Sequence, residues 1–127
     1  MNGRDLARSD RVSKLISRLS AGASLDRSQA FLVKAPLRIC PLGAHVDHQG
    51  GTVTGMTVDR EVLMAVVPGN DAVARLTSLE FPGEVVVDLD DPAPTKAGDW
   101  GDYVRAAVAV LSGGHCLRRG FQAALSV

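Results

Sequence analysis

Residues 38–51 read RICPLGAHVDHQGG and combine one arginine, two histidines, one aspartate and three glycines. Such a stretch has too many polar side chains and too little apolar bulk to form part of a core. Glycines let a backbone turn sharply and let a ligand approach it closely. The stretch therefore predicts a loop, which either makes a tight structural turn or holds a metal ion, a phosphate group or a sugar.

The rest of the composition narrows the class of protein. The chain has 127 residues with 14 basic and 14 acidic side chains, which favours one domain without net charge. This balance gives no electrostatic reason to expect nucleic acid or an anionic membrane as a partner. The charged N-terminus lacks an apolar signal core, and the longest apolar run, residues 62–67, is far shorter than a membrane span. We expect a cytoplasmic protein in which Cys40 and Cys116 are free thiols.

Hydrophobic periodicity around the loop predicts a mixture of helices and strands. Ser9 or Asp10 could cap a helix whose apolar stripe is Val12, Leu15, Ile16 and Leu19. Residues 29–36 form a strand that stops at Pro36, and residues 121–127 form a final strand. A second helix covers residues 100–111 and stops at Gly113 or Gly114. Four runs should form an antiparallel meander, with Asp59 and Arg60 as a turn: residues 52–59, 61–68, 72–79 and 83–90.

Two chemistries for the loop have weak support in the sequence. His45, Asp47 and His48 form H-x-D-H, and imidazoles with a carboxylate can bind zinc or iron. The usual dinuclear hydrolase pattern would need another histidine at Gly43, and none is present. Cys40 lies five residues before His45, but no nucleophile signature surrounds the pair.

A sugar suits the loop better. The Asp47 carboxylate could accept hydrogen bonds from two adjacent hydroxyls, and a neighbouring histidine could donate or accept. The glycines would let the backbone approach the sugar ring. Arg38 would supply a fixed positive charge for a phosphoryl group or a developing anion. This combination is typical of transfer chemistry on a carbohydrate.

A family resemblance supports the sugar. Residues 35–51, APLRICPLGAHVDHQGG, resemble without gaps the galactokinase signature A-P-G-R-V-N-L-I-G-E-H-T-D-Y-N-G-G of the GHMP small-molecule kinases. Residues 100–111, WGDYVRAAVAVL, are similar to the family's W-x-x-Y-V-x-G helix. The resemblance implies an α+β fold like the N-terminal domain of these kinases, the ribosomal protein S5 domain 2-like architecture. Residues 1–28 would be an N-terminal helix and linker, and residues 29–127 the galactokinase-like domain.

The resemblance also implies a role for each matching residue. Arg38 corresponds to the active-site arginine near the anomeric oxygen of the sugar. His45 and Asp47 correspond to ligands of the sugar hydroxyls. Gly50 and Gly51 correspond to the backbone turn beside the ring.

Ala44 departs from the galactokinase pattern, which has a glutamate in contact with the C6 hydroxyl. A substrate with a carboxylate at C6 would be repelled by glutamate and could be accepted by alanine. The full stretch, including Cys40, Pro41, His48 and Gln49, is similar to plant-type galacturonokinases. We therefore favour galacturonic acid as the sugar, with galactose as the alternative.

The resemblance implies ATP and Mg²⁺ as cofactors of a sugar 1-kinase, but the sequence lacks the family's phosphate loop, which resembles Gly-Leu-Ser-Ser-Ser-Ala. Residues 111–115, LSGGH, follow a predicted helix instead of leading into one, so they present carbonyls rather than amides. We expect the sugar-binding half of a kinase, truncated before the phosphate loop and inactive alone. A non-catalytic sugar-binding or regulatory module and a metal-dependent hydrolase using His45, Asp47 and His48 are the alternative hypotheses.

Overall fold

The computed structural model describes residues 3–19, 26–92, 96–115, 117 and 119–127. Five strands in this part of the chain form one mixed sheet in the order β1-β2-β5-β3-β4. The elements are α1 (Gly3–Leu19), η1 (Arg27–Gln29), β1 (Phe31–Ile39), η2 (Asp47–Gln49), β2 (Met56–Pro68), β3 (Val73–Ser78), β4 (Glu84–Asp88), α2 (Asp102–Gly114) and β5 (Phe121–Ser126). The α+β class that the resemblance implies is confirmed.

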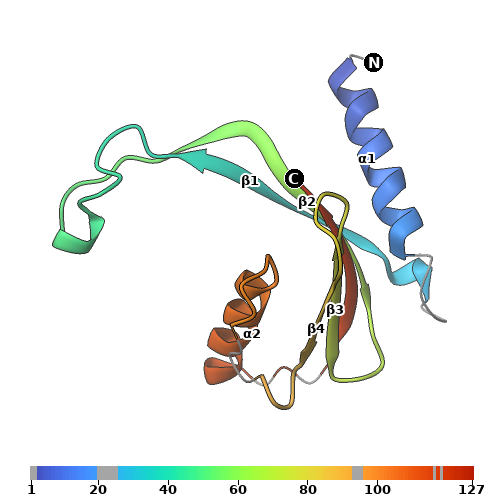
Figure 1. The fold of residues 1–127 in the computed structure, drawn as a ribbon. Helices are drawn as coiled ribbons and strands as arrows, with labels where there is room; N and C mark the ends of the chain where they lie inside the picture. Colours follow the sequence, from blue (N-terminus) through green and yellow to red (C-terminus); the bar gives the residue numbers. More distant parts are fainter. Residues whose placement is uncertain (1–2, 20–25, 93–95, 116, 118) are drawn as a thin grey trace.

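The two helices lie on opposite faces of the sheet (Figure 1). Successive residues of a strand point to opposite faces, so β2 and β5 contribute to two cores. Ala123 and Ala124 of the central strand β5 illustrate this, because the first packs on the α2 side and the second on the α1 side. The α1 core contains Leu15, Leu19, Leu63, Ala65, Val67 and Ala124. The α2 core contains Val66, Ala74, Leu76, Val85, Val87, Leu89, Val108 and Ala123.

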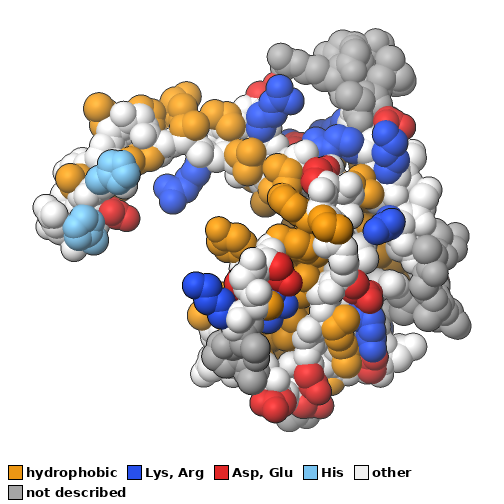
Figure 2. Space-filling view, viewed as in Figure 1, with side chains coloured by type: hydrophobic (Ala, Val, Ile, Leu, Met, Phe, Trp, Pro, Cys, Tyr) orange, Lys and Arg blue, Asp and Glu red, His pale blue; other side chains and the backbone are white. Residues whose placement is uncertain are grey.

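The first two strands extend beyond the rest of the sheet as a ribbon, which we call the arm (residues 36–61). β2 pairs with β5 only from Leu63 to Pro68, whereas its pairing with β1 continues as far as Met56. The arm projects past α2 and carries residues 40–55 at its free end (Figure 1). Hydrophobic side chains remain exposed along it (Figure 2). The position of the loop therefore depends on the arm and not on burial in a core.

The arm is fastened to α1 by a group of charges around Glu61. The Glu61 carboxylate pairs with Lys34 at 2.6 Å and with Arg8 at 3.4 Å. The hydrogen bond from Lys34 lowers the pKa of Glu61, and the positive charges of Arg8, Lys34 and Arg11 lower it further. The Arg11 guanidinium donates at 3.2 Å to the backbone carbonyls of both Glu61 and Ser126. These contacts join α1, β2 and β5 at the base of the arm.

Several predicted boundaries are wrong. α1 begins at Gly3, so Ser9 and Asp10 lie inside the helix and do not cap it, although the predicted Leu15 and Leu19 are buried. Pro36 does not end β1, which is an edge strand where a missing N–H can face away from the sheet. α2 begins at Asp102, after the predicted start, and ends at Gly114, one of the two predicted stops.

The predicted meander is also wrong in its connections. Asp59 and Arg60 do not form a turn, because β2 is continuous through them. They lie where the pairing with β1 shifts register: Pro36 pairs with Glu61, but Arg38 pairs with Thr57. β3 and β4 pair antiparallel as predicted, whereas β5 inserts between β2 and β3 and runs parallel to β3.

Neither of the helices in the described residues combines the length and the apolar content that crossing a membrane requires.

Candidate functional site

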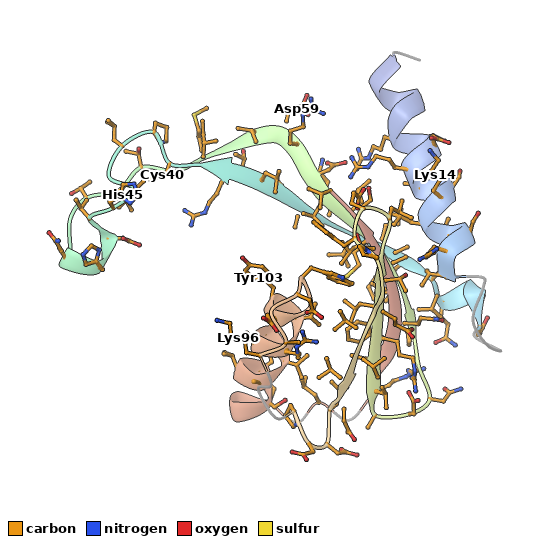
Figure 3. The ribbon with its side chains drawn as sticks, in the orientation of Figure 1. Lys14, Cys40, His45, Asp59, Lys96 and Tyr103 are labelled. Carbon is orange, nitrogen blue, oxygen red and sulfur yellow. The ribbon has the colours of Figure 1, made fainter. Side chains whose placement is uncertain are left out.

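The free end of the arm gathers most of the predicted site residues into one turn. Ala44, His45 and Asp47 lie between the glycines of the loop, and all three are exposed. Figure 3 shows His45 at the far end of the arm and Cys40 where β1 enters the loop. Arg38 lies before the loop, on β1 opposite Thr57. The structure therefore places the predicted sugar ligands together, with Arg38 further back along the arm.

The glycines give the turn its shape. Gly43 has a φ of +83°, and a Cβ added there would lie 2.4 Å from the carbonyl oxygen of Thr52. Gly50 has a φ of +73° and ends the 3-10 turn Asp47–Gln49 by donating its N–H to the Asp47 carbonyl at 3.1 Å. Gly51 donates to the Val46 carbonyl at 2.9 Å, and a Cβ there would lie 2.7 Å from Val46 Cγ2. Side chains at these positions would strain or open the turn.

Leu42 and Thr54 close the base of the loop. The Thr54 amide donates to the Leu42 carbonyl at 3.0 Å, and the Leu42 amide donates to the Thr54 hydroxyl at 3.1 Å. The same hydroxyl donates to the Leu42 carbonyl at 3.3 Å. Sequence reasoning missed Thr54, because no periodicity links a hydroxyl to a backbone twelve residues away.

The side chains of Asp47, His48 and Gln49 form a short polar series on the turn. Gln49 Nε2 lies 3.1 Å from His48 Nε2, and His48 Nδ1 lies 3.7 Å from Asp47 Oδ1. If the amide of Gln49 donates to Nε2, the neutral imidazole carries its proton on Nδ1, facing the carboxylate. The side chain of Asp47 is 71% exposed, so its oxygens can accept hydrogen bonds from a ligand.

The metal and nucleophile hypotheses gain no geometric support from the loop. Among the described residues, no three His, Cys, Asp or Glu side chains are grouped closely enough to hold a metal ion. The Cys40 thiol is free, as predicted, and donates to the Leu42 carbonyl at 3.2 Å. It therefore contacts the backbone at the base of the loop. Cys116 lies outside the described residues.

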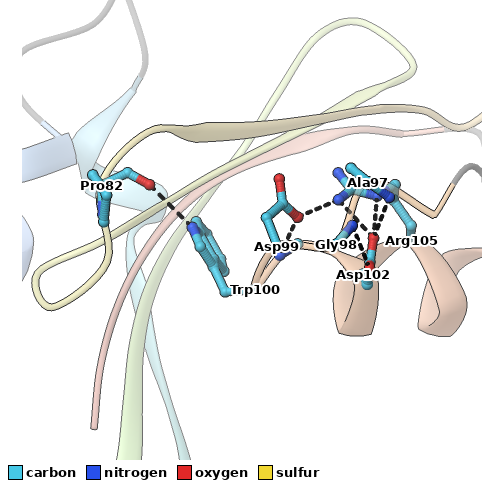
Figure 4. A network of polar contacts seen from close by, with 8 residues as sticks. Pro82, Ala97, Gly98, Asp99, Trp100, Asp102 and Arg105 are labelled. Carbon is cyan, nitrogen blue, oxygen red and sulfur yellow. Dashed lines mark hydrogen bonds and ion pairs between the residues drawn. The ribbon is translucent and has the colours of Figure 1, made fainter.

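The carboxylates of Asp99 and Asp102 bind the backbone of the segment that leads into α2 (Figure 4). The Asp102 carboxylate accepts the amides of Ala97 at 2.8 Å and Gly98 at 2.9 Å, and these bonds, with Arg105, lower the pKa of Asp102. Asp99 also pairs with Arg105, whose pKa is raised mainly by its hydrogen bond to Asp102. These amides belong to the segment before the helix, and the N-cap of α2, Gly101, makes no side-chain cap hydrogen bond.

The segment before α2 is fixed to the sheet by Trp100. Its indole N–H donates to the Pro82 carbonyl at 3.2 Å (Figure 4). Its ring also stacks against Phe81, with centroids 6.4 Å apart. At the other end of α2, the amide of His115 donates to the Leu111 carbonyl at 2.8 Å. Residues 111–115 therefore end a helix, as predicted, and do not form a loop that leads into one.

Comparison with known proteins agrees with a sugar loop. Residues 23–68 match the galactokinase galactose-binding signature. A galacturonokinase from Arabidopsis thaliana is 41% identical over 102 residues, which cover 68% of this chain and 24% of that protein. A galactokinase from Chloroflexus aurantiacus is 32% identical over 80 residues, which cover 63% of this chain and 20% of that protein.

Two solved structures share the fold. Lactococcus lactis galactokinase complexed with galactose matches with a TM-score of 0.71 and 26% identity, over 80% of this chain and 27% of that one. Methanococcus jannaschii mevalonate kinase matches with a TM-score of 0.55 and 13% identity, over 80% of this chain and 33% of that one, and shows the fold alone.

The fold and the signature loop define the N-terminal region of a GHMP kinase. Within that superfamily, the chain belongs with the galactokinases and galacturonokinases and is homologous to their N-terminal sugar-binding region. It spans 20–24% of the length of the curated relatives described above.

Proposed function

We propose that the loop at the end of the arm binds galacturonic acid and supplies the sugar side of a kinase site that phosphorylates the C1 hydroxyl. The observation that carries the proposal is the ungapped signature of residues 35–51 on an exposed turn, with Ala44 in place of glutamate. The 41% identity to a galacturonokinase supports the same sugar.

The chemistry proposed for each residue is the one that the galactokinase resemblance implies. Asp47 accepts hydrogen bonds from neighbouring sugar hydroxyls, and His45 donates or accepts beside it. Gly50 leaves space for the ring against the backbone, because a Cβ there would meet nothing within 4 Å, and Gly51 forms the turn beside it, packed against Val46. Arg38 faces the anomeric end of the sugar, where its fixed charge favours ionisation of the C1 hydroxyl.

The segment that leads into α2 does not fit the phosphates of ATP. The amides that lead into α2 are bonded to Asp99 and Asp102, and their negative charge would repel a phosphate. ATP and Mg²⁺ supply the phosphoryl group and its charge neutralisation in kinases of this superfamily, and we derive no transfer step from this chain alone. A non-catalytic sugar-binding module remains the second candidate function, because it requires the same loop.

Calorimetric titration of the chain with galacturonate tests the proposed sugar. Asp47→Ala should weaken the affinity about 10- to 30-fold, because a carboxylate bonded to two hydroxyls contributes more than a neutral acceptor would. Asp91→Ala removes an equally charged, exposed carboxylate far from the loop and should leave the affinity unchanged. Absence of binding by the unaltered chain would refute the sugar site.

The same preparation, incubated with galacturonate and Mg²⁺-ATP, separates the two candidate functions from a complete enzyme. We expect binding without production of galacturonate 1-phosphate. Turnover by this chain would contradict the assignment of the sugar side alone.

Ala44→Glu tests the assignment of the C6 contact. A carboxylate at this position should weaken galacturonate binding about tenfold by like-charge repulsion and should leave galactose binding unchanged or improved. Ala44→Gln adds almost the same volume without charge, so it should affect both sugars alike. Equal losses of galacturonate and galactose affinity with glutamate would show that residue 44 does not face C6.

A further inference from the structure

We propose that Thr54 is a positioning residue that fixes the shape of the sugar-binding loop through its hydroxyl. This inference rests on the proposed function, because it concerns the loop assigned to the sugar. Thr54 is not among the residues assigned to the sugar, and it would act through the backbone that carries them.

The hydroxyl satisfies both polar groups of Leu42. It accepts the Leu42 amide at 3.1 Å and donates to the Leu42 carbonyl at 3.3 Å, while the Thr54 amide donates to that carbonyl at 3.0 Å. Two residues twelve positions apart are thus joined by three hydrogen bonds, two of which need the side chain. We call these three bonds the clasp.

Nothing apolar replaces the clasp at this point. Leu42 is 70% exposed, and Thr54 is exposed as well, so neither residue is held by a core. The β-ladder ends at the pair Ile39 and Met56. Two residues separate Ile39 from Leu42, and one residue separates Met56 from Thr54. The clasp is therefore what sets the distance between the two sides where the loop leaves the arm.

Its geometry is passed on to the turn through consecutive backbone contacts. Gly43 follows Leu42 and lies close to Thr52 and Val53, leaving no space for a Cβ. The Gly43 carbonyl accepts the Val46 amide at 3.2 Å, and the Val46 carbonyl accepts the Gly51 amide at 2.9 Å. Because Asp47 lies between Val46 and Gly51, a change at the clasp shifts the carboxylate.

Two variants isolate the hydroxyl. Thr54→Val keeps the branched shape and removes both side-chain bonds, whereas Thr54→Ser keeps the hydroxyl. We expect Thr54→Val to weaken galacturonate binding about five- to tenfold, as the loss of two modest hydrogen bonds predicts, and Thr54→Ser to stay within about twofold. The thermal midpoint should not change in either variant, since the clasp lies outside both cores.

Amide hydrogen exchange measures the stability of the clasp in the absence of the sugar. In Thr54→Val the Leu42 amide should exchange about tenfold faster, and the Val46 and Gly51 amides should also exchange faster, whereas Thr54→Ser should match the unaltered chain. Faster exchange at Leu42 with unchanged exchange at Gly51 would overturn the positioning role. Unchanged galacturonate affinity in Thr54→Val would overturn it too. If the unaltered chain binds no galacturonate, the proposed function fails, and the exchange at Gly51 still decides whether Thr54 fixes the loop.

Discussion

Gly43→Ala should weaken galacturonate binding by about a hundredfold or more, since the strain of a positive φ adds to a direct clash. The new Cβ would lie 2.4 Å from the Thr52 carbonyl oxygen and 3.0 Å from Val53 Cα. Both neighbours are backbone atoms, so neither can move aside as the end of a flexible side chain would. The loop must open to accept the methyl group, and the turn that carries Asp47 opens with it.

Gly50→Ala is the matched control for Gly43→Ala. Gly50 has a similar φ of +73°, but a Cβ there meets nothing within 4 Å. Within the chain, only the strain of about 1–2 kcal/mol applies, but the methyl group would also enter the space proposed for the sugar ring. The comparison is therefore made on the loop without sugar, by the exchange of the Val46 and Gly51 amides, which should be accelerated more by Gly43→Ala than by Gly50→Ala. Equal exchange in the two variants would show that the contact with Thr52 does not shape the loop.

Gly120→Ala should destabilise the whole protein by about 3–5 kcal/mol, a large part of the stability of a domain of this size. The added Cβ would lie 2.1 Å from the Val73 carbonyl oxygen and 2.5 Å from its nitrogen. Gly120 also exchanges backbone hydrogen bonds with Asp71 and Gly69 where β5 enters the sheet. Because β5 lies between β2 and β3, displacing its first residues disturbs both ladders.

Gly113→Ala is the control for the destabilisation expected from Gly120→Ala. Gly113 lies in the last turn of α2, and a Cβ there meets nothing within 4 Å. Alanine is the better helix former, so this variant should be neutral or up to about 1 kcal/mol more stable. Urea unfolding followed by circular dichroism measures both variants. The clash at Val73 would be refuted if Gly120→Ala unfolded at the same midpoint as Gly113→Ala.

The elements of the fold could be predicted where apolar spacing is regular. The stripe that includes Leu15 and Leu19 identified α1, and the alternation in β3 with the valines of β4 identified this pair of strands. Spacing reports which face a residue occupies and not which strand lies beside it, so the insertion of β5 was not predictable. The polar pair Asp59 and Arg60 led to the prediction of a turn, but it lies where the β1–β2 ladder shifts register.

The candidate site also has a part that the sequence could predict and a part that it could not. The loop residues could be named from the sequence because their polar and glycine positions form a fixed, ungapped pattern. The contacts of Thr54 with Leu42 and of Gly43 with Thr52 could not, because they join side chains or Cα positions to backbone groups. Such contacts depend on the path of the chain and have no signature in residue type. The polar atoms that would meet the ligand were therefore easier to predict than the groups that hold them.

The central position of β5 in the sheet also determines the order in which the strands can pair during synthesis of the chain. The hairpin of β1 with β2 and that of β3 with β4 are local in sequence, and each can form once its own residues have left the ribosome. They are not neighbours in the sheet, because β5 separates them. The nascent chain must therefore hold two unjoined hairpins, with their inner edges uncovered, until residues 121–126 emerge and connect them.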